Sequence, residues 1–117
     1  MIISSSENAP VARVAGPQVS AENAVRMKDD LLTLIHQGAV NLIVDLGSVK
    51  SIDSSGIAAF LMILKRLGPR GDLVFINIGS RVEQAFRITR MDRVFTIVPS
   101  LAEACELLGD SGLRKAA

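Results

Sequence analysis

Two short apolar runs constrain the fold more than any other feature of this chain. Residues 42–46 begin with Leu-Ile-Val, and residues 73–78 are apolar at every position but one. Neither run alternates regularly between apolar and polar residues, as a strand with one solvated face would. Strands of this kind occur in parallel sheets, where helices cover both faces. The pattern therefore predicts two inner parallel strands in an α/β fold.

The rest of the chain supplies the other elements of such a fold. An N-terminal hairpin is predicted from residues 2–3 and 11–15, because the Ser, Asn and Pro residues between them favour a turn. Helices are expected over about 21–37 with Ser20 as the cap, over about 55–67, and after the two capping-box pairs Ser80–Glu83 and Ser100–Glu103. A last strand is expected over 94–98. We predict a single α/β domain over residues 1–109, with a mixed, mostly parallel β-sheet, the hairpin and about four helices, followed by a frayed tail at 110–117.

Composition narrows the class of protein. The chain has 117 residues, 49% of them hydrophobic, which suits one domain with one apolar core. Its formal net charge of +1 gives no field that would steer nucleic acid. A basic n-region followed by an apolar segment is missing at the N-terminus, and the apolar run 57–64 is too short to cross a membrane. We expect a cytoplasmic protein that binds neither nucleic acid nor membrane.

Catalytic and metal-binding patterns are missing as well. His36 is the single histidine, and no Ser/His/Asp triad or metal-ligand spacing can be built around it. Cys105 falls on the apolar face of the last predicted helix, where a buried, inert thiol is expected. The arginines between 81 and 93 are not interleaved with aromatic residues, as nucleic-acid binding would favour. We expect no enzyme activity, no metal and no cofactor.

The segment Asp53-Ser54-Ser55-Gly56 lies between a predicted strand and a helix. Taken alone it is most simply a helix cap, because Asp and Ser both suit that position. The helix that follows is unusual, since residues 57–64 are apolar on every face for two turns. A helix lying on a sheet normally keeps a polar outer stripe. The outer side of this helix is therefore either covered within the domain or used to dock a partner, and the residues favour neither alternative.

In this context the chain resembles the STAS domain family (sulphate transporter and anti-sigma factor antagonist), specifically its bacterial anti-sigma factor antagonists. The resemblance covers about residues 12–109. It rests on a set of short matching segments: Gly16, Asn23-Ala24, residues 43–46, residues 52–57, residues 73–77 and residues 91–95. The most specific of these is Asp-Ser-Ser-Gly between a strand and a helix. The resemblance implies the fold predicted above and a protein that binds other proteins.

The resemblance also implies a mechanism. In the family, an anti-sigma factor binds the domain while the first serine of the motif is unmodified, which frees a sigma factor. The anti-sigma factor is often a serine kinase of the histidine-kinase-like ATPase type, and it releases the antagonist by phosphorylating that serine. A metal-dependent serine phosphatase reverses the reaction. The matching phosphoacceptor here is Ser54, and the implied partner-binding residues are Asp53, Ser55, Gly56, Ile57, Ala58, Ala59 and, in a loop near the partner surface of relatives, Ser20.

A second function of a different class stays open. The chain could be a constitutive structural STAS subunit that braces a transporter ATPase or a signalling scaffold. An unshielded hydroxyl at Ser54 favours the phosphorylation switch over this structural role.

Overall fold

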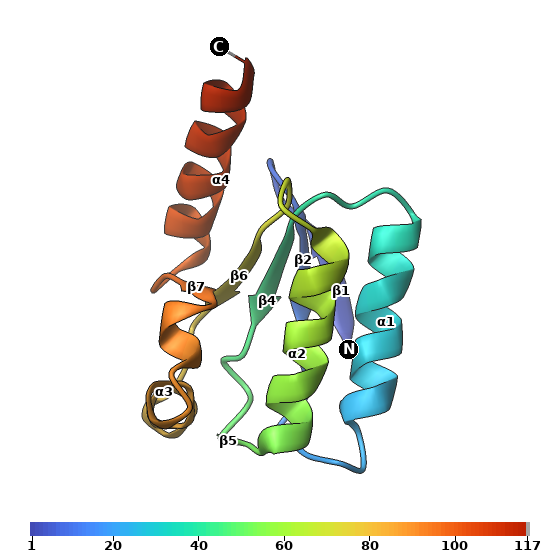
Figure 1. Ribbon diagram of the computed structural model, residues 1–117, viewed down its shortest axis with the longest axis vertical. Helices are drawn as coiled ribbons and strands as arrows, with labels where there is room; N and C mark the ends of the chain where they lie inside the picture. The colour runs from blue at the N-terminus through green and yellow to red at the C-terminus, as the bar shows by residue number, and fades with distance from the viewer. Residues whose placement is uncertain (117) are drawn as a thin grey trace.

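The computed structural model describes residues 1–116, with side chains for residues 1–109. The strands in chain order are β1 (Ile2–Ser5), β2 (Pro10–Arg13), β3 (Gln18–Val19), β4 (Leu42–Asp45), β5 (Ser51–Ile52), β6 (Leu73–Ile76) and β7 (Thr96–Ile97). The helices are α1 (Ala24–His36), α2 (Ser54–Leu67), α3 (Ser80–Ile88) and α4 (Leu101–Ala116), with a 3-10 turn at Met91–Arg93. Figure 1 shows α1 and α2 side by side in front of the sheet.

The main sheet has five strands in the order β1-β2-β4-β6-β7. β1 pairs with β2 in antiparallel fashion, which confirms the N-terminal hairpin. β2, β4, β6 and β7 are parallel, with Val44 opposite Phe75 in the β4–β6 pair. A second, two-stranded parallel sheet joins β3 to β5. The mixed, mostly parallel sheet and the four helices predicted from the sequence are confirmed.

Helices cover both faces of the main sheet, and the inner strands are buried as their sequences predict. Along β4, Leu42 and Val44 belong to the large core beneath α1 and α2, whereas Ile43 between them belongs to a smaller cluster beneath α4. β6 divides in the same way, with Phe75 on one face and Val74 on the other. Successive strand residues point to opposite faces, so one apolar run supplies both clusters.

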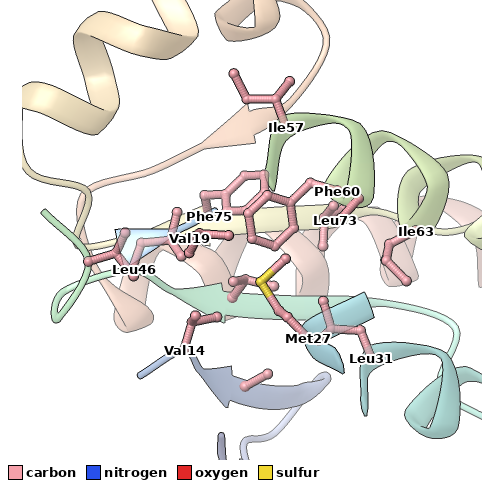
Figure 2. Close-up of a cluster of buried hydrophobic side chains, with 14 of the residues drawn as sticks. Val14, Val19, Met27, Leu31, Leu46, Ile57, Phe60, Ile63, Leu73 and Phe75 are labelled. Carbon is pink, nitrogen blue, oxygen red and sulfur yellow. The ribbon is translucent and has the colours of Figure 1, made fainter. Parts of the chain in front are cut away.

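The large core is centred on Phe75. Its ring lies 4.8 Å from that of Phe60, 5.0 Å from that of Phe95 and 5.4 Å from that of Phe86, measured between centroids. Figure 2 shows Phe60 and Phe75 together, with Met27 and Leu31 of α1 packed on the same cluster. Tilted and edge-to-face ring pairs of this kind are the favoured aromatic geometries. They hold α2, through Phe60, and α3, through Phe86, against the sheet.

Three expected helix caps differ from the structure. α1 begins at Ala24, with Asn23 at its N-cap, and the Ser20 side chain makes no cap. Residues 21–23 instead form a turn, and the amides of Asn23 and Ala24 both donate to the Ser20 carbonyl oxygen. The N-cap of α3 is Gly79, and Ser80 is already inside the helix. Glu83 pairs with Arg87, and the expected capping box does not form. The predicted box at Ser100 is half formed, since the Glu103 amide donates to the Ser100 hydroxyl over 3.3 Å.

The last described element of the chain is α4. α4 is helical to Ala116, whereas the side chains of the expected frayed tail, 110–117, and the whole of residue 117 lie outside the described residues. Fraying of this tail therefore stays a prediction. Within the described part of the chain, no helix combines the length and the apolar character needed to cross a membrane.

Candidate functional site

Ser54 is the first residue of α2 and lies at the carboxyl edge of the main sheet, where the chain passes from β4 through β5 into the helix (Figure 1). Asp53, one residue earlier, is the N-cap. Its Oδ1 atom accepts hydrogen bonds from the amides of Ser55, at 2.9 Å, and Gly56, at 3.1 Å. These are two of the amides that a helix start leaves without a partner. Asp53 therefore caps the helix, and the Ser54 side chain is not needed for this purpose.

The Ser54 side chain is exposed to solvent. Its hydroxyl makes no hydrogen bond with any of the residues that the structure describes. The first bond of the helix runs from the Ile57 amide to the Asp53 carbonyl oxygen over 3.1 Å, so the backbone around Ser54 is ordered without help from its side chain. An exposed, unpaired hydroxyl on a fixed backbone is chemically available to an incoming enzyme.

The short β3–β5 sheet holds this helix start in place. The Asp53 amide donates to the Val19 carbonyl oxygen over 3.0 Å, and the Lys50 and Ser51 amides both donate to the Pro17 carbonyl oxygen. These three hydrogen bonds tie the loop before α1 to the loop before α2. Residues more than 30 positions apart in the sequence form one rigid platform around Ser54.

Asn23 braces the loop that forms one side of the platform. Its Oδ1 accepts a hydrogen bond from the Ser20 amide, at 2.9 Å, and its Nδ2 donates to the Gln18 carbonyl oxygen, at 2.8 Å. One amide side chain therefore fixes the path of the backbone from β3 into α1. Asn23 is part of the family pattern, but the sequence alone gives it no role in the site.

Gly56 brings α2 close to the platform. A Cβ atom at this position would lie 2.7 Å from side-chain carbons of both Val19 and Ile52, closer than such atoms can approach. Val19 is almost completely buried and belongs to the large core. The glycine in the motif therefore allows the first turn of α2 to pack directly on β3 and β5.

The structure separates the predicted partner-binding residues into two groups. Asp53 and Ala58 are exposed, and Ser20 and Ser55 are half-buried, so these four can be touched by another protein. The other three, Gly56, Ile57 and Ala59, are buried. The buried residues can shape the surface but cannot form much of it. The partner-binding roles of all seven stay predictions.

His36 and Cys105, the other candidates from the sequence, lie away from Ser54. His36 is at the last turn of α1, and its Nε2 is 3.5 Å from an Arg66 nitrogen near the opposite end of α2 from Ser54. Cys105 is half-buried on α4 against the other face of the sheet, where its carbonyl oxygen accepts from the Asn8 side chain. In the described part of the chain, no three His, Cys, Asp or Glu residues are grouped to hold a metal ion.

Several known proteins resemble this chain in sequence or in fold. A protein from Thermotoga neapolitana, named as an anti-sigma factor antagonist homologue, is 29% identical over 91 residues, which is 76% of this chain and 80% of that protein. An anti-sigma factor antagonist from Mycobacterium paratuberculosis superposes with a TM-score of 0.83 at 18% identity, covering 92% of this chain and 91% of the other. The unphosphorylated form of the anti-sigma factor antagonist SpoIIAA gives a TM-score of 0.76 at 18% identity, covering 93% and 96%.

The two structural matches show a shared fold. The family itself follows from the sequence, because residues 2–104 match the STAS domain. That range runs from β1 into the first turn of α4 and includes every strand of both sheets. This chain belongs to the STAS domain family.

Proposed function

We propose that this protein is an anti-sigma factor antagonist whose binding is switched by phosphorylation of Ser54. In the unmodified form it binds an anti-sigma factor that is also a serine kinase of the histidine-kinase-like ATPase type. Phosphorylation of Ser54 releases that partner, and a serine phosphatase restores binding. The protein acts in the cytoplasm and catalyses no reaction itself. Membership of the STAS family and the names of the relatives support this proposal.

The observation that carries the proposal is the free hydroxyl of Ser54. It is exposed at the first position of α2, and no described residue hydrogen-bonds to it. A serine needed to cap the helix would use its oxygen for that purpose, but Asp53 already fills this role. A kinase can therefore modify Ser54 without removing an interaction that holds the fold together.

A phosphate at Ser54 would stay at the protein surface. It adds a charge of about −1.5 to −2 and three strong acceptor oxygens. The amides of Ser55 and Gly56 are already bonded to Asp53, so the phosphate would find few free backbone donors and would remain hydrated. It would also lie beside the exposed Asp53 carboxylate, which concentrates negative charge at one point. A partner packed closely on Ser54 would have to strip water from that charge, at a high cost.

The same geometry explains why the fold would survive the modification. Negative charge is favourable at the N-terminal end of a helix because of the helix dipole. The exposed residues Asp53 and Ala58, with half-buried Ser20 and Ser55, supply the proposed contact surface. Beneath them Gly56, Ile57 and Ala59 support the backbone. Binding would then change while the domain stays folded.

Phosphate mapping in the natural host tests the proposal. The protein is incubated with ATP and a lysate of its own cells, and phosphorylated peptides are identified by mass spectrometry. We expect phosphate on Ser54, its loss in Ser54→Ala, and its retention in the matched control Ser55→Ala. Phosphate at unchanged stoichiometry in Ser54→Ala would move the acceptor to another serine. Absence of phosphate under all conditions, together with constitutive assembly into a larger complex, would instead identify a structural STAS subunit.

A further inference from the structure

An open groove runs between α1 and α2 beside Ser54. It has a volume of about 330 Å³. Its lining comes from both helices and from the turn before α1: Ala21, Ala24, Val25 and Lys28 on one side, and Ser55, Ala58, Ala59 and Met62 on the other. We call this feature the α1/α2 groove. Ser55 connects it directly to the phosphorylation site.

The shape and apolar character of the α1/α2 groove suit one large side chain. Four of its lining residues are alanines, which leave space between the helices. Val25 and Met62, one from each helix, are 61% and 53% exposed in spite of their size. Large apolar side chains that gather in one exposed recess mark protein contacts more often than chance exposure. An apolar anchor from a partner, seated between them, would remove both from water.

The charge of the groove is as informative as its shape. Lys28 is the one charged side chain among the described residues that line it. No ion pair is formed by Lys28 with any residue in the described part of the chain. Across the groove, α2 has no Asp or Glu from Ser54 to Leu67. Lys28 thus presents an uncompensated positive charge at the border of an apolar recess, which is complementary to a carboxylate.

We infer that the α1/α2 groove binds a segment of the anti-sigma factor that carries a large aliphatic or aromatic residue next to an Asp or Glu. The apolar side chain enters between Val25 and Met62, and the carboxylate pairs with Lys28. This inference rests on the proposed function and deepens it, because it makes α1 part of the interface and states what the partner must present. Ala58 and Ser55 line the same groove, so the anchor would lie next to the surface that a phosphate on Ser54 makes negative.

Site-specific photo-crosslinking in the natural host locates the occupant. Val25, Met62 and Ser20 are replaced, one at a time, by a photoreactive phenylalanine analogue, and crosslinked peptides are sequenced by mass spectrometry. Ser20 belongs to the proposed contact surface but does not line the groove. Positions 25 and 62 should both capture the same segment of an anti-sigma factor, with an apolar residue and a neighbouring Asp or Glu. Ile88 on α3, 74% exposed, is the matched control and should not capture that segment.

The outcomes separate the groove from the switch. Capture of the anti-sigma factor from position 20 but not from 25 or 62 would overturn the groove and leave the proposed function standing. Capture of a second copy of this chain from 25 and 62 would overturn the assignment of the occupant. If none of the three positions captures an anti-sigma factor, the proposed function fails and this inference fails with it.

Charge reversal tests the role of Lys28 once the partner segment is known. Lys28→Glu should weaken binding at least tenfold, because it places two negative charges together at the border of the interface. Arg26→Glu is the matched control. It lies on the same helix but lines a different recess, with Met1 and Val14, and should change binding less than threefold. Exchanging the partner's carboxylate for Lys should restore the affinity of Lys28→Glu. Lack of this rescue would show that the carboxylate does not face Lys28.

Discussion

At the scale of single residues, Asp53 and Ser54 are neighbours with different roles. The Asp53 carboxylate holds two backbone amides of α2, while the Ser54 hydroxyl is exposed and unpaired with any described residue. In the proposed function, stability and regulation therefore depend on separate side chains. A modification at Ser54 leaves the cap in place, which allows the two roles to be tested independently.

Ser54→Asp should leave the free energy of unfolding almost unchanged. An anion at a helix start gains about 0.3–1 kcal/mol from the helix dipole, and repulsion from the Asp53 carboxylate offsets part of that gain. Binding to the anti-sigma factor should fall steeply, because the charge mimics part of a phosphate. Urea unfolding followed by circular dichroism, beside a binding assay, measures both effects. Marked destabilisation would show that Ser54 supports the fold.

Asp53→Ala is the matched control for this experiment. It should lower stability by about 0.5–2 kcal/mol, the usual cost of losing an N-cap side chain. Ser54→Ala should not show this loss, because Ser54 makes no cap in the structure. Equal losses in the two alanine variants would contradict the assignment of the cap to Asp53.

Gly56→Ala should destabilise the protein even though alanine favours helices. The added Cβ would come within 2.7 Å of Val19 and Ile52, and overpacking of this kind costs about 1–3 kcal/mol. The gain in helix propensity is about 1 kcal/mol and does not fully compensate. Thermal unfolding measures the difference. Gly79→Ala at the N-cap of α3 is the control. A Cβ there would meet open space, so the loss of stability should be smaller and reflect only the N-cap preference for glycine over alanine.

At the scale of elements, α2 is buried on one side and partly exposed on the other. Phe60 and Ile63 are completely buried against the sheet, Leu61 and Leu64 are half-buried, and Met62 is mostly exposed. The helix therefore belongs to the core, and its exposed residues Ala58 and Met62 form an apolar outer strip. α1 covers one flank of α2, which explains why a polar stripe is not needed along the whole helix (Figure 1).

Neighbouring alanines in α2 test the two sides of the helix. Ala58→Asp should fold, because Ala58 is exposed, but should lose the binding of its kinase. Ala59→Asp should unfold the domain, since Ala59 is buried in the large core and an unpaired buried charge costs several kcal/mol. Circular dichroism and a pull-down distinguish the outcomes. A folded Ala58→Asp variant that still binds would remove the outer strip of α2 from the interface.

The elements that the sequence predicts well are those with a strong local pattern. Continuous apolar runs identify β4 and β6, and helical spacing identifies the buried face of α1 at Ala24, Met27 and Leu31. The platform of β3 and β5 was missed, because strands of two residues carry no periodicity. Their pairing depends on backbone hydrogen bonds between distant loops, which side-chain patterns do not encode. The start of α1 was wrong by three residues for a related reason, since Asn23 bonds backward to the loop.

The sequence likewise predicts the part of the site around Ser54 but not the part that α1 contributes. Ser54 and its neighbours stand out because Asp-Ser-Ser-Gly is a contiguous motif. Val25 and Lys28 do not stand out in the sequence, because neither belongs to the buried face of α1. Their position beside Met62 depends on how α1 packs on α2. A groove built from two helices requires the tertiary structure.

At the scale of the whole molecule, the sheet separates the site from α4. α1, α2 and the four phenylalanines lie on one face, and α4 covers the other through Ala104 and Leu108. The β1–β2 turn adds a bond from the Asn8 side chain to the Cys105 carbonyl oxygen over 2.7 Å. α4 therefore contributes to stability from the side away from Ser54.

Leu108→Ala should weaken the fold without changing binding. Leu108 is 3% exposed in the smaller cluster, and truncation of a buried leucine costs about 2–5 kcal/mol. Affinity for the anti-sigma factor, measured by calorimetry at a temperature where the variant is still folded, should match that of the original protein. A large change in affinity would mean that the two faces of the sheet are coupled.

The platform of β3 and β5 has a kinetic consequence. In the isolated domain the Asp53 amide is already bonded to the Val19 carbonyl oxygen, and the Lys50 and Ser51 amides to that of Pro17. Little chain entropy therefore remains to be lost when a partner arrives. Association can then proceed by rigid docking, without a slow rearrangement that limits the rate. Repeated cycles of capture and release would depend on how quickly Ser54 gains and loses its phosphate, rather than on how quickly the domain changes shape.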